Sequence, residues 1–207
     1  MAKTTKTDFS HAKQKRSEKT LDDLLDAALE IVEGAKPEKF TSRWLAEKSG
    51  YSLGTLIKRL GSIENVFLWA ITKGREKHFE SFAKIIAAFD SSRPLNEFIE
   101  MMTDEYIAAI RKVSPKVMRY YETRSMAKGD LSFNPYHYTD VLVKPYLKIA
   151  KQNKTQTFRD LSEDEVKLIF RSIYSMLARP FIESNPIAGT RRHRRIVVEN
   201  IARLLGR

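Results

Sequence analysis

Apolar residues recur at steps of three and four along almost the whole chain, the spacing that places them on one face of an α-helix. One such run consists of Leu95, Ile99, Met102, Tyr106, Ile110 and Val113. Extended stretches that alternate apolar and polar residues and are rich in β-branched side chains do not occur in the sequence. The pattern therefore predicts an all-α protein of about nine helices, without an internal repeat.

Capping residues and glycines divide the first ninety residues into four predicted helices. We expect them at about 20–32, 42–49, 52–61 and 62–89, opened by Thr20, Thr41, Ser52 and Ser62. The second and third are short and are joined by the turn Gly50-Tyr51-Ser52, which is the arrangement of a helix-turn-helix. In such a motif the second helix lies in the major groove of DNA.

Five further helices are predicted after the break at residues 91–94. Proline at a first helical position, a Ser162–Glu165 capping box and the apolar spacing place them at about 95–113, 115–128, 134–153, 162–184 and 190–205. Pro145 and Pro180 fall inside these predicted helices. A proline inside a helix removes a backbone hydrogen bond and kinks the axis, so two kinked helices could open a cavity.

Composition adds a strongly basic character to this helical chain. The 207 residues are 42% apolar, carry a net charge of +11 and include no cysteine. Neither a membrane-spanning run nor a secretory signal is found in the sequence, so a cytoplasmic protein is expected. Nucleic acid, an anionic membrane surface or an acidic partner would each suit the charge. Residues 1–19 hold six basic residues against two acidic ones, which indicates either a solubilising tail or a basic arm that reaches DNA.

The helix-turn-helix region resembles a known family at the level of its residues. The matching segments are LLDAALEIV at 24–32 and FTSRWLAEKSGYSLGTLIKRLGSIENVF at 40–67. Together they resemble the N-terminal signature of the TetR (tetracycline-repressor-like) transcriptional regulators. The resemblance covers about residues 20–68 and implies double-stranded DNA as a partner, a homodimer and a small-molecule effector.

The resemblance also implies which residues contact DNA. Arg59 could contact either a phosphate or a guanine edge, and the residues alone leave both open. In the family, the start of the second helix and the start of the fourth approach phosphates, whereas the third helix faces the groove. The implied DNA-contacting residues are Thr41, Ser42, Arg43, Ser52, Leu53, Gly54, Thr55, Ile57, Lys58, Arg59 and Ser62.

The domain plan that follows has three parts: a basic arm at 1–19, a DNA-binding domain at 20–66 and a helical ligand-binding and dimerisation domain at 67–207. The resemblance implies that the last two helices, about 162–184 and 190–205, pair with those of a second subunit. Alternatively, their apolar faces close the core of one monomer. A ligand cavity, or plain core, is expected to involve Trp69, Met101, Met102, Tyr106, Met118, Tyr121, Tyr138 and Tyr174.

A run of four arginines and one separate arginine complete the candidate features. The last predicted helix begins with four arginines, which form either a solvated face or a contact for an acidic partner: Arg191, Arg192, Arg194 and Arg195. Arg124, near two tyrosines, could meet an anionic ligand or form a surface ion pair.

The sequence gives little support for an enzymatic function. The four histidines are far apart in the chain, and neither a metal-binding histidine motif nor a glycine-rich phosphate loop is found. We therefore expect a non-enzymatic regulator, a repressor without metal or cofactor. The alternative is a TetR-like structural or interaction protein that binds DNA without a small ligand.

Overall fold

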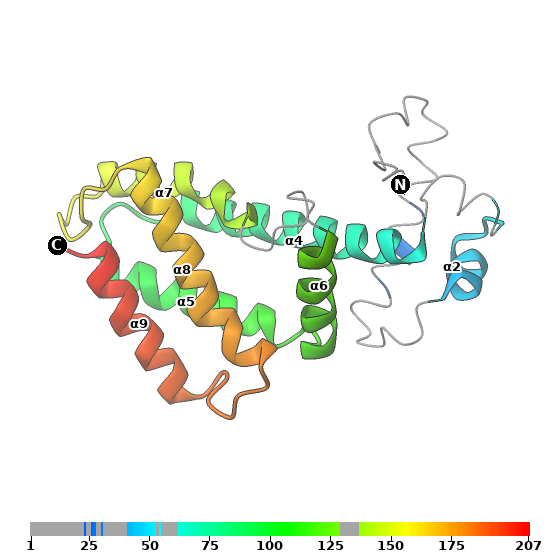
Figure 1. Cartoon of the computed structure of the whole chain (residues 1–207). Coiled ribbons are helices and arrows are strands. Elements are labelled where there is room, and N and C mark those ends of the chain that lie inside the picture. The colour runs from blue at the N-terminus through cyan, green and yellow to red at the C-terminus, as the bar shows by residue number, and fades with distance from the viewer. Residues whose placement is uncertain are drawn as a thin grey trace, which may run out of the picture. The chain divides into compact units, whose positions relative to one another are not determined.

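The computed structural model describes residues 41–52, 54, 62–128 and 137–207, with the isolated positions 23, 26, 27 and 30. This part of the chain is helical and contains no β-strand (Figure 1). Its elements are α2 (Ser42–Ser49), α4 (Ile63–Ala87), α5 (Leu95–Ile110), α6 (Pro115–Lys128), the 3₁₀-helix η4 (His137–Leu142), α7 (Val143–Gln152), α8 (Glu163–Ile182) and α9 (Arg191–Leu205). The all-α prediction is confirmed for these residues.

Two predicted helices, at about 20–32 and 52–61, fall mostly outside the described residues. Of the positions described there, Asp23, Asp26, Ala27, Glu30 and Gly54 are helical, and Ser52 precedes the helical position 54. The count of nine helices therefore stays a prediction. Within the described residues, none of the helices is both long enough and apolar enough to span a membrane.

Backbone contacts divide the chain into an N-terminal unit, residues 1–74, and a C-terminal unit, residues 75–207. The division falls inside α4, eight residues after the predicted boundary at 66. In the N-terminal unit α2 begins as predicted, because the Thr41 hydroxyl accepts a hydrogen bond from the Trp44 backbone N–H at 3.2 Å. Gly50 ends the helix in the left-handed conformation, with φ of 71°.

The C-terminal unit is built around α8, which packs against η4, α5, α6, α7 and α9. Its N-terminus carries the predicted capping box: the Ser162 hydroxyl accepts from the Glu165 backbone N–H, and the Glu165 carboxylate accepts from the Ser162 backbone N–H. Residues that α4 to α9 bury together form one apolar core rich in aromatic rings. Such burial, at about 25 cal/mol per Å² of apolar surface, supplies most of the free energy that holds the helices together.

Hydrogen bonds from distant segments secure the ends of this unit. Pro94 precedes α5 without a capping side chain, and the hydroxyl of Thr157 instead accepts from the Leu95 backbone N–H at 2.9 Å. Phe158 forms a single antiparallel bridge with Gly206 at the C-terminal end of the chain. The loop after α7 therefore joins the start of α5 to the end of α9.

The single helix predicted at 134–153 is wrong in its described part, which contains η4 followed by α7. Pro145 is the third residue of α7. A proline in the first helical turn loses no backbone hydrogen bond, because the N–H groups of that turn have no partner within the helix. The helix consequently starts just before Pro145, and the predicted kink at this residue does not arise.

Pro180, by contrast, lies inside α8 as predicted. Proline has no N–H, so the backbone carbonyl of Met176 one turn earlier loses its usual partner. The buried His193 from α9 takes that place, with its Nε2 3.0 Å from the Met176 oxygen. Its Nδ1 accepts from the Gly189 backbone N–H at 3.1 Å, which assigns the proton to Nε2. The proline and the histidine thus form one joint between α8 and α9.

The hydroxyl of Tyr146 is buried and lacks a hydrogen-bond partner among the described residues. Burial also raises the pKa of this phenol above its ordinary range. Tyr146→Phe is therefore expected to leave the free energy of unfolding unchanged or to increase it by up to about 1 kcal/mol, because it removes an unsatisfied polar atom. Urea titration would measure this, and a loss of 2 kcal/mol or more would show that the hydroxyl has a stabilising partner.

Candidate functional site

The predicted DNA-contacting residues that the structure describes lie at the ends of α2 and just before α4. Thr41, Arg43, Ser52, Gly54 and Ser62 are exposed, and Ser42 is half-buried. The hydroxyl of Ser62 accepts from the Asn65 backbone N–H at 3.1 Å and so caps α4 as predicted. The other predicted contacts, Leu53, Thr55, Ile57, Lys58 and Arg59, lie outside the described residues and stay predictions.

Packing and two side-chain contacts hold α2 in place. Leu45 on this helix is fully buried. Lys48 Nζ lies 2.9 Å from the Glu30 carboxylate, and the Tyr51 hydroxyl donates to Asp23 at 3.0 Å. Both acidic partners belong to the segment predicted as the first helix, so the turn of the motif is fixed against it. The helix that carries the exposed residues Thr41 and Arg43 is therefore held in place by packing and side-chain contacts.

The two glycines of the motif differ in what the fold requires of them. Gly50 has φ of 71°, a conformation that residues with a side chain rarely adopt. Gly54 lies in a helix without a positive φ, and a Cβ built at that position meets no atom within 4 Å. The fold itself therefore does not require glycine at position 54, although glycine costs a helix about 1 kcal/mol relative to alanine.

A cavity of about 60 Å³ lies inside the C-terminal unit. Residues from α4, α5, η4, α8 and α9 line it, and most of them are apolar. The polar groups in its wall belong to Thr103, Tyr106, Thr139 and Tyr174. The hydroxyl of Thr103 is buried and has no hydrogen-bond partner in the described part of the chain.

Three of the predicted ligand residues, Met102, Tyr106 and Tyr174, line this cavity. The remaining five are not part of its wall. Met118, Tyr121 and Tyr138 are buried in the core, Met101 packs against that core, and Trp69 belongs to the N-terminal unit. Tyr121 and Tyr138 are hydrogen-bonded to each other through their hydroxyls, at 2.9 Å.

Arg75, in α4, is a half-buried arginine that was not predicted from the sequence as a site residue. Its Nη1 is buried without a hydrogen-bond partner, and its guanidinium carbon lies 4.4 Å from the centre of the Tyr121 ring. Burial lowers its pKa, but the surrounding tyrosines 174, 121, 106 and 138 outweigh burial and keep the pKa above its ordinary value. The sequence could have indicated that Arg75 faces the core, because it lies four residues from both Ile71 and Phe79 and so interrupts an apolar helix face.

The basic run at the start of α9 is only partly a solvated face. Arg191, Arg192 and Arg195 are exposed. Arg194 instead binds the Asp104 carboxylate on α5 with two N–H groups, at 2.6 and 2.9 Å. Such bidentate pairing fixes geometry as well as charge, so this arginine joins α9 to α5.

Hydrogen bonding from Arg194 lowers the pKa of Asp104 below its ordinary value. The pair therefore stabilises the fold fully above about pH 4, and the contribution is lost as pH falls through the lowered pKa. Because both side chains are partly exposed, Asp104→Asn should lower the free energy of unfolding by less than about 1 kcal/mol at pH 7. Urea titrations at pH 7 and pH 3 should show the difference shrinking, with Glu105→Gln, an exposed change on the same helix, as the control.

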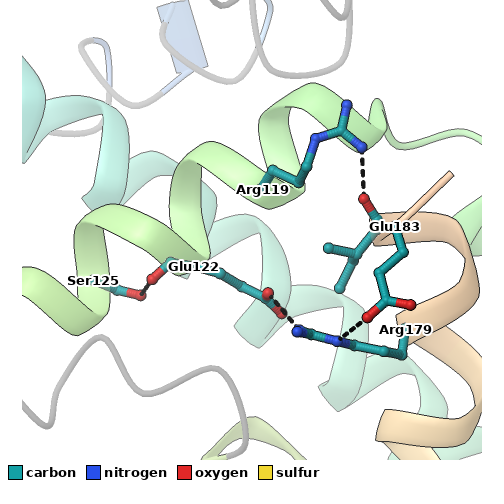
Figure 2. Close-up of polar contacts among 6 residues, drawn as sticks. Arg119, Glu122, Ser125, Arg179 and Glu183 are labelled. Carbon is teal, nitrogen blue, oxygen red and sulfur yellow. Dashed lines mark hydrogen bonds and ion pairs between the residues drawn. The ribbon is translucent and has the colours of Figure 1, made fainter.

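A second group of charged side chains joins α6 to the end of α8 (Figure 2). Arg179 donates to Glu122 at 2.9 Å and to Glu183 at 2.8 Å. Arg119 donates to the backbone carbonyl of Ile182 at 2.6 Å, which satisfies an acceptor that a helix end leaves free. These contacts join the C-terminal turn of α8 to α6.

Comparison with known proteins supports the fold. None of the family models matches the chain, and the curated proteins contain no match either. A solved protein of Mesorhizobium loti MAFF303099, assigned provisionally to the TetR family of transcriptional regulators, superposes with a TM-score of 0.66 at 14% identity, over 94% of this chain and 100% of its own. A provisional TetR-family regulator of Shewanella sp. PV-4 superposes with a TM-score of 0.51 at 14% identity, over 91% and 98%. The chain therefore has the TetR-like fold that its helix-turn-helix sequence resembles.

Proposed function

We propose that this chain is a one-component transcriptional regulator of the TetR type. It acts as a repressor that binds palindromic operator DNA as a homodimer and is released by a small-molecule effector. The observation that carries this proposal is the combination of a TetR-like fold with the helix-turn-helix sequence at 40–67, whose first helix is capped and turned as the motif requires. The cavity in the C-terminal unit supports the effector.

The start of α2 is suited to a DNA phosphate. A helix N-terminus presents free N–H groups and a partial positive charge, which together bind anions. The first turn of α2 has no acidic residue and includes the exposed Arg43, a cation that opposes the helix dipole unless an anion is bound nearby. The first turn of α4 includes Glu64, so α2 is the better supported of the two phosphate contacts.

Gly54 supports close approach of the motif to DNA. A glycine that the fold does not need is explained if another molecule comes near the backbone at that point. Gly54→Ala is therefore expected to increase the free energy of unfolding by up to about 1 kcal/mol and at the same time to weaken binding to DNA.

Gly50→Ala is the matched control, because its positive φ predicts a loss of stability with the same added methyl group. Urea titration and fluorescence anisotropy with a DNA site selected from random sequences would measure both effects. If Gly54→Ala bound that site as tightly as the wild type, a close approach at residue 54 would be ruled out.

The exposed surface of α8 and α9 supports a homodimer. Leu168 on α8 is 65% exposed, which is unusual for leucine, and Ile196 on α9 is 39% exposed. Leu168 lies on the side of α8 opposite to the buried Val166 and Phe170. Both belong to the two helices that the resemblance assigns to the interface, and a second copy would cover these apolar side chains.

The same helices connect the cavity with α6 and with the proposed dimer interface. Phe170, Tyr174 and Leu177 of α8 line the cavity, and Arg179 and Ile182 at its end are joined to α6. An effector that changes the position of α8 would thus change α6 and the dimer together. Coupling is reciprocal, so the effector should bind less tightly to the DNA-bound protein than to the free protein.

The alternative is a DNA-binding protein of the same fold without an effector. The small volume of the cavity favours it, because about 60 Å³ has room for only about four waters. The two functions differ in whether any small molecule stabilises the protein and releases it from DNA.

A further inference from the structure

Arg75 has a buried guanidinium nitrogen that lacks a hydrogen-bond acceptor among the described residues, which is unfavourable in free energy. A buried charge is unfavourable unless it is paired and hydrogen-bonded. The Tyr121 ring covers one face of the guanidinium, at 4.4 Å, and such a contact does not satisfy the N–H groups that lie in the guanidinium plane. The buried Nη1 has no acceptor among the described residues, and no carboxylate there forms an ion pair with Arg75.

The tyrosines around Arg75 do not neutralise it. Burial raises the pKa of Tyr106 well above its ordinary value, so this phenol stays uncharged at neutral pH. The hydroxyls of Tyr121 and Tyr138 are hydrogen-bonded to each other. Among the residues that the structure describes, the positive charge of Arg75 therefore has an aromatic environment and no paired anion.

This environment is continuous with the cavity. Tyr121, which lies against the Arg75 guanidinium, is hydrogen-bonded to Tyr138, and the Tyr138 ring stacks on Phe79 of the cavity wall with centroids 6.4 Å apart. Tyr106 and Tyr174 belong to the same wall. Their rings meet edge to face, with centroids 6.0 Å apart. The unpartnered hydroxyl of Thr103 belongs to the same cavity wall. A molecule in the cavity would therefore meet apolar rings and a free hydroxyl, and the cavity wall is connected to Arg75 through Tyr138 and Tyr121.

We propose that the C-terminal unit binds a small organic monocarboxylate, with its carboxylate on Nη1 of Arg75 and its apolar body in the cavity beside Tyr106 and Tyr174. The inference rests on the proposed function and names the chemical class of its effector. A carboxylate matches the guanidinium fork and forms strong, charge-assisted hydrogen bonds. One unpaired cation balances one negative charge, so a dianion would bury an excess charge.

Size sets the remaining limit. The cavity is small and Nη1 has no exposed surface in the free protein, so binding must open the wall near the tyrosines. A body of a few carbon atoms or a single aromatic ring is the size that such an opening accommodates. The candidates are therefore short branched-chain or single-ring acids, and long-chain or multiply charged acids are excluded.

The test uses the full-length protein and a panel of acids from butyrate and isovalerate to benzoate, each beside its amide of the same shape. Thermal unfolding and calorimetry measure binding to the wild type, to Arg75→Met and to Arg124→Met. Arg124, for which the sequence left an anion contact open, is exposed, stacks on Tyr120 and is not part of the cavity wall, so it serves as the matched control. At least one acid should raise the Tm in proportion to its concentration, whereas its amide should not.

Arg75→Met should weaken binding of that acid at least tenfold, whereas Arg124→Met should bind it as the wild type does. Without an acid, Arg75→Met should unfold at the same temperature as the wild type or higher, because it removes an unpaired buried charge, so misfolding would not explain lost binding. The proposal is overturned if none of the acids raises the Tm, if acid and amide act alike, or if Arg75→Met retains full affinity.

A parallel measurement of DNA binding distinguishes a test of this site from a test of the proposed function. An acid that stabilises the wild type and also releases it from DNA supports both. An acid that stabilises the protein without any effect on DNA binding supports the site and contradicts the effector mechanism. Acid binding by a protein without affinity for any DNA would support the site and overturn the regulator.

Discussion

Leu168→Glu is expected to convert the proposed homodimer into monomers and to weaken binding to operator DNA at least a hundredfold. The two-fold symmetry of a homodimer would place two new carboxylates in one interface, each of which loses its hydration without a partner. Leu168 is 65% exposed in the single chain, so the substitution leaves the core of the monomer intact. A monomer reaches only one half-site, and the high local concentration of the second DNA-binding head is lost.

Sedimentation equilibrium would measure the mass of the protein in solution, and fluorescence anisotropy would measure its affinity for DNA. Val141→Glu is the matched control, because it places the same charge at another exposed apolar residue, 42% exposed and outside α8 and α9. That variant should stay dimeric. A Leu168→Glu protein that remains dimeric at micromolar concentration would contradict the proposed interface.

Removing Lys58 and Arg59 should have the second large effect. Both lie in the segment that the resemblance places in the major groove. A bidentate arginine contact to guanine discriminates between bases by about 1–3 kcal/mol, and a homodimer makes every contact twice. Lys58→Ala together with Arg59→Ala is therefore expected to weaken operator binding by about 2–6 kcal/mol, with circular dichroism as the check that the helices remain.

The single variants separate the two roles left open for Arg59. If Arg59 contacts a phosphate, Arg59→Ala should weaken all DNA sequences alike and make binding less dependent on salt. If it contacts guanine, the variant should lose preference at one position of each half-site. If the double variant bound operator DNA as tightly as the wild type, the predicted contacts of Lys58 and Arg59 with DNA would be ruled out.

The features that could be predicted from sequence are those decided by residues close together in the chain. The Thr41 and Ser62 caps and the Ser162–Glu165 box each join residues three positions apart, so the spacing alone identifies them. Gly50 was likewise predicted to end the second helix, and the structure has α2 end there in the left-handed conformation. The division of 134–153 into η4 and α7 was missed because a proline in the first helical turn and one inside a helix look alike in sequence.

The cavity and the buried charge depend on contacts between distant segments. Met102, Tyr106 and Tyr174 were predicted near a ligand, whereas Thr103 and Thr139 were not, because a threonine on a helix face has no pattern that marks it as cavity wall. Arg194 looked like part of an exposed run, and its partner Asp104 lies ninety residues earlier. Such pairings follow from how the helices pack, which local spacing does not encode.

The central claim is that this chain reads DNA sequence as a two-fold symmetric dimer. Selection of bound sequences from random double-stranded DNA, followed by sequencing of the enriched pool, tests it most directly. The account predicts an enriched palindrome whose half-sites lie about one helical turn apart, about 10 base pairs, with information concentrated at a few positions of each half. A pool that stays random, or an enriched site without two-fold symmetry, would contradict it.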